Sequence, residues 1–217
     1  MNDLLIKLGE IGVIPVIKLE KPEQAKDLGH ALLDGGLPCA EITFRAAGAE
    51  GAISTMASFF PKILVGAGTV LSVDQAQRAL GAGARFIVSP GFAYKIVDWC
   101  LERDVPVIPG VSTPTEIMFG LDRGLEVLKF FPVETIGGPA ALKAVSEVFS
   151  GIHFIPTGGV SAGNLSDYLR MRSVLAVGGS WMVKSDLIKD CRFDRIATLA
   201  HEASSMVAQV RTEGDQK

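Results

Sequence analysis

One short apolar run decides the predicted fold of this chain, and it reads Leu125-Glu126-Val127-Leu128-Lys129-Phe130-Phe131-Pro132. Such a run, bounded here by Gly124 and Pro132, predicts a buried strand. A lysine inside it is costly because a desolvated ammonium loses its hydration, so burial favours the neutral amine. A neutral amine is a nucleophile toward carbonyl carbon and can form a Schiff base. The alternative interpretation is a lysine at a strand end whose ammonium extends into water.

Seven further runs of this kind lie on either side of the lysine run, and amphipathic segments alternate with them. The predicted strands cover 13–19, 39–44, 63–67, 85–88, 106–109, 125–132, 153–156 and 174–177. Helices are predicted from 22 to the glycines at 35 and 36, over 49–60, from 72, from 114, over 139–149 and over 193–210. The polar tail at 212–217 is expected to fray.

Strands that alternate with helices in this way predict an α/β fold with a parallel sheet. Eight strand–helix units in 217 residues favour a (β/α)8 TIM barrel, with residues 1–217 forming a single domain. An open doubly wound sheet is the alternative. We favour the barrel because no strand has the character of an exposed edge.

Composition narrows the classes of function. The net charge of −3 excludes a broad basic face for nucleic acid. Three separated cysteines, Cys39, Cys100 and Cys191, form neither a metal spacing nor a disulfide framework, which indicates core fillers in a reducing compartment. The sequence shows no signal peptide and no apolar run of about 18 residues, so we expect a cytoplasmic protein with no membrane partner.

Charged side chains are predicted at the rim of the barrel. In this fold functional groups gather at the carboxyl ends of the strands, where Lys129 lies. Glu41, Thr43 and Arg45 alternate along one strand and therefore share a face. Glu41 can act as a carboxylate base beside Arg45, a cation that can hold a substrate carboxylate. A buried Glu41–Arg45 ion pair with a structural role is the alternative.

Two glycine pairs are predicted to follow the last two strands, at 158–159 and at 178–179, with Ser180 after the second. The loops after strands seven and eight are where this fold builds phosphate sites, and glycine lets the backbone approach an anion closely. Either pair alone is also typical of a simple turn. Thr69 and Thr157 follow strands too, where a hydroxyl can serve a ligand or cap a helix.

The other polar residues, Lys18 and the three histidines, add no further catalytic or metal-binding group to the predicted site. Lys18 either adds positive charge near a bound anion or extends into solvent. The histidines at 30, 153 and 201 have no ligand-like spacing, so no metal site is expected. An amine nucleophile, a carboxylate base, an arginine and a phosphate cradle together suit a phosphorylated 2-oxo acid that reacts through an iminium.

Eight motifs in these segments resemble those of the KDPG/KHG aldolases, which act on 2-dehydro-3-deoxy-phosphogluconate and 4-hydroxy-2-oxoglutarate. The resemblance extends from Val13 to about Val207. The motifs are Ile14-Pro15-Val16-Ile17, Glu41-Ile42-Thr43-Phe44-Arg45, Val65-Gly66-Ala67-Gly68-Thr69-Val70, Ser89-Pro90-Gly91, Ile108-Pro109-Gly110-Val111-Ser112-Thr113, Lys129-Phe130-Phe131-Pro132, Pro156-Thr157-Gly158-Gly159 and Gly178-Gly179-Ser180-Trp181.

The resemblance implies a class I aldolase that reversibly cleaves 2-dehydro-3-deoxy-6-phospho-D-gluconate to pyruvate and D-glyceraldehyde 3-phosphate. It also implies cleavage of 4-hydroxy-2-oxoglutarate to pyruvate and glyoxylate. By this resemblance Lys129 forms the Schiff base and Glu41 accepts and donates the proton. Arg45 and Thr69 would bind the pyruvyl carboxylate, and Thr157 would govern stereochemistry at the new carbon.

Other positions follow from the same resemblance. Pro90 and Phe131 would line the pocket, and the phosphate would be held by Gly158, Gly159, Gly178, Gly179 and Ser180. Members of this family need no metal or other cofactor and are typically trimeric, so a homotrimer is expected. One departure is the pair Ala46-Ala47, where a small polar residue is expected first. It leaves both charged groups in place.

Other functions fit parts of the pattern. An aldolase for the galactonate epimer, or for 4-hydroxy-2-oxoglutarate without a phosphate, would differ at Thr157 and at the phosphate cradle. A metal-dependent sugar-phosphate epimerase would need histidine and aspartate ligands at the strand ends, which the sequence lacks. A non-catalytic sugar-phosphate-binding barrel would leave Lys129 and Glu41 unexplained.

Overall fold

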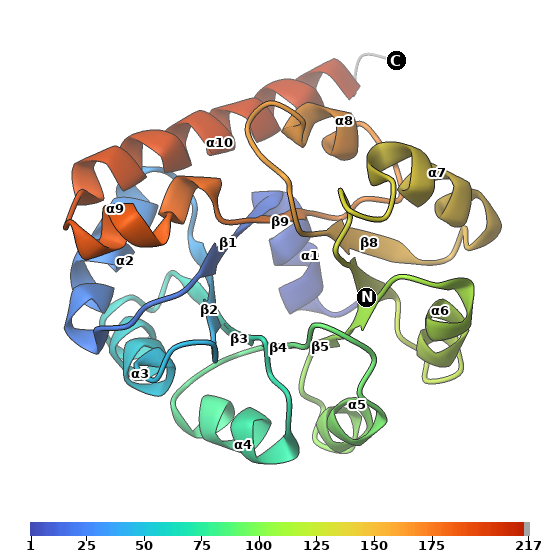
Figure 1. Ribbon diagram of the computed structural model, residues 1–217, viewed down its shortest axis with the longest axis horizontal. Helices are drawn as coiled ribbons and strands as arrows, with labels where there is room; N and C mark the ends of the chain where they lie inside the picture. The colour runs from blue at the N-terminus through green and yellow to red at the C-terminus, as the bar shows by residue number, and fades with distance from the viewer. Residues whose placement is uncertain (215–217) are drawn as a thin grey trace.

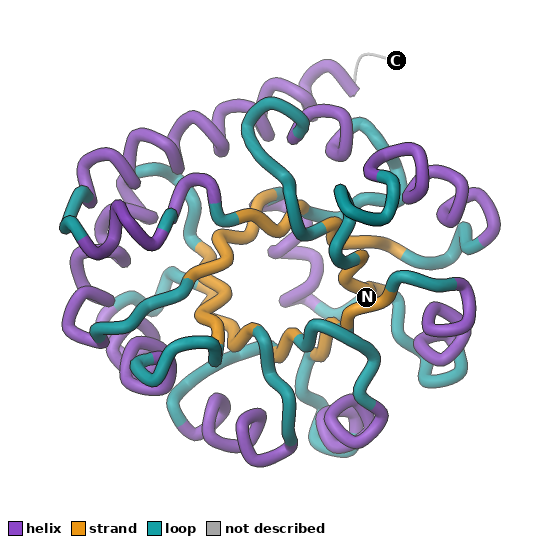
Figure 2. Tube along the Cα trace, in the orientation of Figure 1, coloured by secondary structure: helices purple, strands orange, loops and turns teal. Residues whose placement is uncertain are grey.

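The computed structural model describes residues 1–214 and has an inner ring of strands with helices outside it (Figures 1 and 2). The strands are β1 (Val13–Ile17), β2 (Cys39–Thr43), β3 (Leu64–Gly68), β4 (Ile87–Val88), β5 (Val107–Ile108), β6 (Gly110–Val111), β7 (Val127–Phe130), β8 (His153–Pro156) and β9 (Val177–Gly179). The helices are α1 (Asp3–Ile11), α2 (Ala25–Asp34), α3 (Ala49–Phe59), α4 (Val73–Gly81), α5 (Tyr94–Leu101), α6 (Pro114–Leu121), α7 (Gly138–Val148), α8 (Leu165–Leu169), α9 (Ser185–Lys189) and α10 (Phe193–Gly214). Short 3-10 turns, η1 (Pro22–Gln24) and η2 (Trp181–Val183), precede α2 and α9.

Within residues 1–214 the paired strands are all parallel, and they belong to two sheets. The first has the order β5-β4-β3-β2-β1-β9 and the second has the order β6-β7-β8. Only Pro109 separates β5 from β6, and proline has no N–H to donate to a neighbouring strand. On the other side, isolated bridges join Phe154 to Val174 and Thr157 to Gly178. The ring therefore changes sheets at Pro109, and on the other side it is linked by two isolated bridges, one from β8 to Val174 before β9 and one from Thr157 after β8 to β9.

The predicted α/β fold with parallel strands and surrounding helices is confirmed. In place of one closed ladder of eight strands, residues 1–214 form the two sheets described above. The last strand lies later than predicted, because the ladder with β1 begins at the pair Val13–Val177. At 174 there is only the bridge to Phe154. The predicted frayed tail is wrong for 212–214, where α10 continues, and 215–217 lie outside the described residues.

Two apolar clusters form the core. The larger one fills the space between the strands and the helices, as helix–sheet packing requires. The smaller one lies inside the ring and includes early residues of several strands, among them Ile14, Cys39 and Val127. Leu4 and Leu8 of α1 belong to the same cluster. Helix α1 therefore covers the amino ends of the strands, and in Figure 1 it is seen behind the opening of the ring.

Local sequence explains where several helices begin. Ser72 accepts a hydrogen bond from the Gln75 N–H at the start of α4. At the start of α6, the Thr113 side chain accepts from the Glu116 N–H while the Glu116 carboxylate accepts from the Thr113 N–H, a reciprocal capping box. None of the helices within residues 1–214 has the length and apolar character of a membrane span.

Candidate active site

Lys129 and Glu41 meet inside the ring, although 88 residues separate them. Each is the third residue of its strand, Lys129 in β7 and Glu41 in β2. The Lys129 Nζ lies 3.4 Å from the Glu41 Oε1, and the two side chains are only 6% and 4% exposed. This burial excludes the alternative in which the ammonium of Lys129 extends into water. A buried amine with a carboxylate as its neighbour is the arrangement that proton transfer at a covalent site needs.

Glycine at position 68 makes room for the Glu41 carboxyl. Gly68 lies in β3 beside β2, and a Cβ added to it would stand 2.2 Å from the Glu41 Oε1. The same Cβ would stand 2.6 Å from Cγ of Glu41. The carboxyl of Glu41 therefore rests on the main chain of β3, which helps to hold it toward Lys129.

Arg45 lies just beyond β2 and is exposed. Its Nε donates to the Thr43 Oγ1 at 3.3 Å, and the Thr43 hydroxyl donates to the Ile17 carbonyl at 2.7 Å. The predicted alternative, a buried Glu41–Arg45 ion pair, is wrong, because Glu41 pairs with Lys129 and the Arg45 side chain is held by Thr43. The guanidinium therefore stays available at the carboxyl end of β2.

A cleft of about 340 Å³ brings Arg45 close to the end of β9. Its lining residues come from three places in the chain and include Val16, Lys18, Arg45, Ser180, Lys184 and Ser185. Val16 is the register partner of Glu41, so the cleft adjoins the strand that carries the buried carboxylate. Lys18 also forms an ion pair with Glu20 at 2.6 Å. The three cations of this opening outnumber the carboxylates beside them, which belong to Asp186 in the lining and to Glu20, so the net positive charge favours an anionic ligand.

Pro90 and Phe131 also lie at the carboxyl ends of strands, Pro90 after β4 and Phe131 after β7. The Lys129 Nζ is 5.3 Å from the centroid of the Phe131 ring. The Pro90 carbonyl passes so close to β6 that a Cβ on Gly110 would stand 2.2 Å from its oxygen. Gly110 is the register partner of Lys129. Phe131 therefore lies near the Lys129 amine, whereas Pro90 lies against β6, the strand that pairs with β7.

The two predicted threonines are placed differently. Thr69 is half-buried at the end of β3 with a φ of +53°, and the cap of α4 is Ser72, so Thr69 has no role as a helix cap. Thr157 is 6% exposed, and its hydroxyl donates to the Ile155 carbonyl at 3.3 Å. Thr157 also forms the isolated bridge to Gly178.

The two glycine pairs have different structural roles. Gly158 and Gly159 form a loop after β8 with φ values of +99° and +89°, a region that favours glycine. Gly178 and Gly179 lie inside β9, so their predicted position in the following loop is wrong. They are small for packing reasons, since a Cβ on Gly178 would stand 2.3 Å from the Thr157 Oγ1, and one on Gly179 would overlap the Trp181 ring. Ser180 follows and is exposed.

Sequence reasoning missed a polar pair beside the Gly158–Gly159 loop. Tyr168 donates a hydrogen bond from its hydroxyl to the Glu134 Oε1, across 34 residues of sequence. No motif signals such a contact, because only the return of the chain after β8 brings the two side chains together.

The three cysteines differ in burial, and none of them belongs to a metal-binding group in the part of the chain that the structure describes. Cys39 and Cys100 are free and buried, whereas Cys191 is free and exposed, so the prediction of a core filler is wrong for Cys191. Burial, followed by the nearby Glu41 charge, raises the pKa of Cys39, which keeps it an inert thiol. In residues 1–214 no group of three or more His, Cys, Asp or Glu side chains is placed to hold a metal ion.

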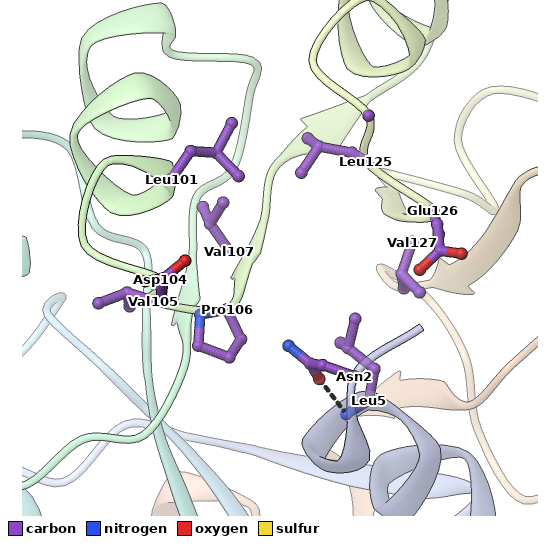
Figure 3. Close-up of a pocket in the computed structure, with 11 residues that line it drawn as sticks. Asn2, Leu5, Leu101, Asp104, Val105, Pro106, Val107, Leu125, Glu126 and Val127 are labelled. Carbon is purple, nitrogen blue, oxygen red and sulfur yellow. Dashed lines mark hydrogen bonds between the residues drawn. The ribbon is translucent and has the colours of Figure 1, made fainter.

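A second cleft, of about 350 Å³, lies at the opposite end of the ring (Figure 3). It is lined by α1 residues and by the chain entering β5 and β7, including Leu5, Pro106, Val107, Glu126 and Val127. None of the predicted site residues lines it. The Lys129 amine, the Glu41 carboxylate and the Gly158–Gly159 loop instead lie toward the carboxyl ends of their strands.

Comparison with known sequences identifies the family. Residues 5–199 match the profile described as KDPG and KHG aldolase. The chain belongs to this aldolase family. It is 44% identical over 200 residues to the 2-dehydro-3-deoxy-phosphogluconate aldolase of Treponema pallidum (strain Nichols), covering 92% of this chain and 95% of that protein. It is also 44% identical over 191 residues to the KHG/KDPG aldolase of Escherichia coli (strain K12), covering 88% and 90%.

A solved aldolase structure supports the same assignment. The KDPG aldolase from Legionella pneumophila, with pyruvate captured at low pH as a covalent carbinolamine intermediate, is 38% identical, with a TM-score of 0.86. The match covers 90% of this chain and 97% of that one. In the present chain, the departure from the family pattern at Ala46 and Ala47 does not displace Arg45. Ala46 is buried, Ala47 is exposed, and Arg45 still lines the 340 Å³ cleft.

Proposed function

We propose that this chain is a class I aldolase that reversibly cleaves 2-dehydro-3-deoxy-6-phospho-D-gluconate to pyruvate and D-glyceraldehyde 3-phosphate. We infer that it also cleaves 4-hydroxy-2-oxoglutarate to pyruvate and glyoxylate. The observation that carries the proposal is the buried Lys129 Nζ, 3.4 Å from the Glu41 Oε1, in a chain of the KDPG and KHG aldolase family. The names of the relatives support this choice of substrates.

In the proposed reaction the Lys129 amine attacks the C2 ketone of the substrate. The carbinolamine that forms loses water and becomes an iminium, which can accept an electron pair. Glu41, acting through a water molecule, takes the proton of the C4 hydroxyl as the C3–C4 bond breaks. The electrons of that bond move into the iminium and give an enamine, and glyceraldehyde 3-phosphate leaves. Protonation of the enamine at C3 and hydrolysis then release pyruvate and free the lysine.

The other residues would bind and orient the substrate. Arg45 and Thr69 would hold the pyruvyl carboxylate, so that the C2 carbon faces the amine of Lys129. The backbone at Gly158 and Gly159 would hold the phosphate together with Ser180 and the end of β9 at Gly178 and Gly179. Pro90 and Phe131 would line the pocket, and Thr157 would contact the aldehyde portion and set the stereochemistry. No metal or other cofactor is required in this scheme.

Borohydride trapping tests the covalent step. With pyruvate present, borohydride should reduce the iminium and label one peptide, the one that contains Lys129. The Lys129→Ala variant should show neither labelling nor cleavage. Lys95 provides a matched control, because it is an exposed lysine on the outer helix α5. The Lys95→Ala variant should label like the wild type. Labelling of Lys129→Ala at another lysine would refute the assignment, and kcat/KM for the two epimeric phosphorylated substrates would establish which one is preferred.

We also infer that the aldolase is a cytoplasmic homotrimer. Exposed apolar side chains support contact with further copies of the chain, and they include Leu71, Met118 and Leu121, which are 64%, 55% and 44% exposed. The free thiols of Cys39 and Cys100 fit a reducing compartment. Light scattering coupled to size-exclusion chromatography measures the mass directly, and a mass of one chain, about 23.0 kDa, would refute the trimer.

A further inference from the structure

A pair of side chains behind the Gly158–Gly159 loop has no part in the chemistry described above. Tyr168 comes from α8 and is fully buried, and Glu134 comes from the turn after β7. The Tyr168 hydroxyl donates to the Glu134 Oε1. Burial, followed by the hydrogen bond and charge of Glu134, raises the pKa of Tyr168, so the phenol remains the donor at neutral pH.

The side chain of Glu134 crosses the Gly158–Gly159 loop on its way to Tyr168. A Cβ added to Gly159 would stand 2.5 Å from Cγ and 2.6 Å from Cβ of Glu134. The stem of Glu134 therefore lies directly against the main chain of Gly159. Any side chain at 159 would displace it.

The backbone of the same turn holds the loop from a second direction. The Glu134 N–H donates to the Gly158 carbonyl at 3.1 Å, and the Val133 N–H donates to the Thr157 carbonyl at 2.9 Å. The loop is thus fixed by two main-chain hydrogen bonds and by the side chain that reaches over it to Tyr168. It is also tied to β7, the strand that carries Lys129.

We propose that Glu134 and Tyr168 are positioning residues that hold the Gly158–Gly159 loop in the conformation that receives the substrate phosphate. The inference rests on the proposed function, in which this loop binds a phosphate and Lys129 attacks the ketone. A loop that is already ordered loses less conformational freedom when an anion binds, so the pair strengthens binding of the phosphorylated substrate. Pyruvate carries no phosphate, and its reaction with Lys129 does not depend on the pair.

The test compares a phosphorylated substrate with pyruvate in the same variants. Tyr168→Phe removes one oxygen and keeps the buried ring. We expect about a tenfold rise in KM for 2-dehydro-3-deoxy-6-phosphogluconate, the scale of losing one hydrogen bond to a charged group. The kcat value and the rate of C3 proton exchange in pyruvate should stay within about twofold of wild type. Glu134→Ala should behave like Tyr168→Phe, and since Glu134 is exposed it provides a second variant if the buried change impairs folding.

Two further variants sharpen the outcome. Glu134→Gln keeps an acceptor oxygen for the tyrosine and should restore KM to within about threefold of wild type. Tyr94→Phe changes the only other tyrosine, which is exposed on α5, and should leave every value unchanged. An unchanged KM in both Tyr168→Phe and Glu134→Ala would overturn the proposal. A parallel loss of phosphorylated-substrate cleavage and pyruvate exchange would also overturn it, because that indicates a general structural role. Failure of the wild type to exchange or trap pyruvate would instead refute the proposed function itself.

Discussion

Gly68→Ala perturbs the site without replacing any of the residues proposed to take part in catalysis. The new Cβ would stand 2.2 Å from the Glu41 Oε1, about 1 Å inside normal van der Waals contact. Because Glu41 is 3% exposed and packed against β3, its carboxyl must move by about that distance, away from its place beside Lys129. A displacement of about 1 Å costs on the order of 10² in rate where positioning matters. We expect kcat/KM to fall by about 10²-fold.

The assay follows pyruvate release by coupling it to lactate dehydrogenase and NADH oxidation. Thermal unfolding is measured in parallel, because extra volume in a packed interior costs about 1–3 kcal/mol of stability. Gly81→Ala is the matched control, since Gly81 ends α4 and a Cβ there has no heavy atom within 4 Å. The reasoning is refuted if folded Gly68→Ala keeps kcat/KM within threefold of the wild-type value.

Three further substitutions change the Glu41 carboxylate itself, the core inside the ring and the cap of α6. Glu41→Gln should lower kcat by about 10²–10⁴-fold, the range for loss of a general acid–base group. Leu8→Ala should lower the free energy of unfolding by about 2–5 kcal/mol and leave kcat unchanged, because this buried side chain lies at the amino ends of the strands. Glu116→Ala should lower the free energy of unfolding by about 1 kcal/mol at pH 7 through loss of the capping box. That difference should shrink as the solution is acidified.

The pH dependence follows from the direction of the Glu116 shift. Burial alone would raise the pKa of Glu116, but hydrogen bonds from the backbone and hydroxyls of Ser112 and Thr113 outweigh it and lower the pKa. The carboxylate therefore stabilises the fold fully above its unfolded pKa of about 4.3, and this contribution is lost as pH falls through the lower folded value. Urea unfolding at several pH values measures it, with Glu147→Ala, an exposed helical glutamate, as control.

For each of these three substitutions, one measured outcome would contradict the expected effect. Wild-type turnover in Glu41→Gln would assign proton transfer to another group. A loss of kcat in Leu8→Ala would mean that α1 influences the opposite end of the ring. A difference between wild type and Glu116→Ala that grows on acidification would contradict the direction of the pKa shift.

Much of the fold follows from local pattern. The strand at 153–156 coincides with β8, and the helix predicted over 49–60 is α3 to within one residue. Helix α1 was not predicted, although Asn2 caps it and Gly12 ends it with a left-handed φ of +76°. Those two signals were sufficient to find it. Local chemistry therefore determines the existence and order of the strands and helices better than it determines the residues at which the strands end.

Local sequence does not determine the role of a residue whose neighbours are distant along the chain. Gly178 and Gly179 have the sequence of a turn, yet they lie in a strand because Thr157 and Trp181 occupy the space of their missing side chains. The burial of Lys129 is predictable from the sequence, because a charged residue within an apolar run is visible there. Its closeness to Glu41 required the ring to bring β2 and β7 face to face.

The separation of Lys129 from Glu41 along the chain has a consequence for fragments of this protein. The turn at Asp104 is exposed and lies between the two residues, so a cut there leaves the amine on one piece and the carboxylate on the other. Neither piece alone would contain a pair able to trap and release pyruvate. Pyruvate turnover after mixing would therefore report the joining of the two halves rather than the folding of either one.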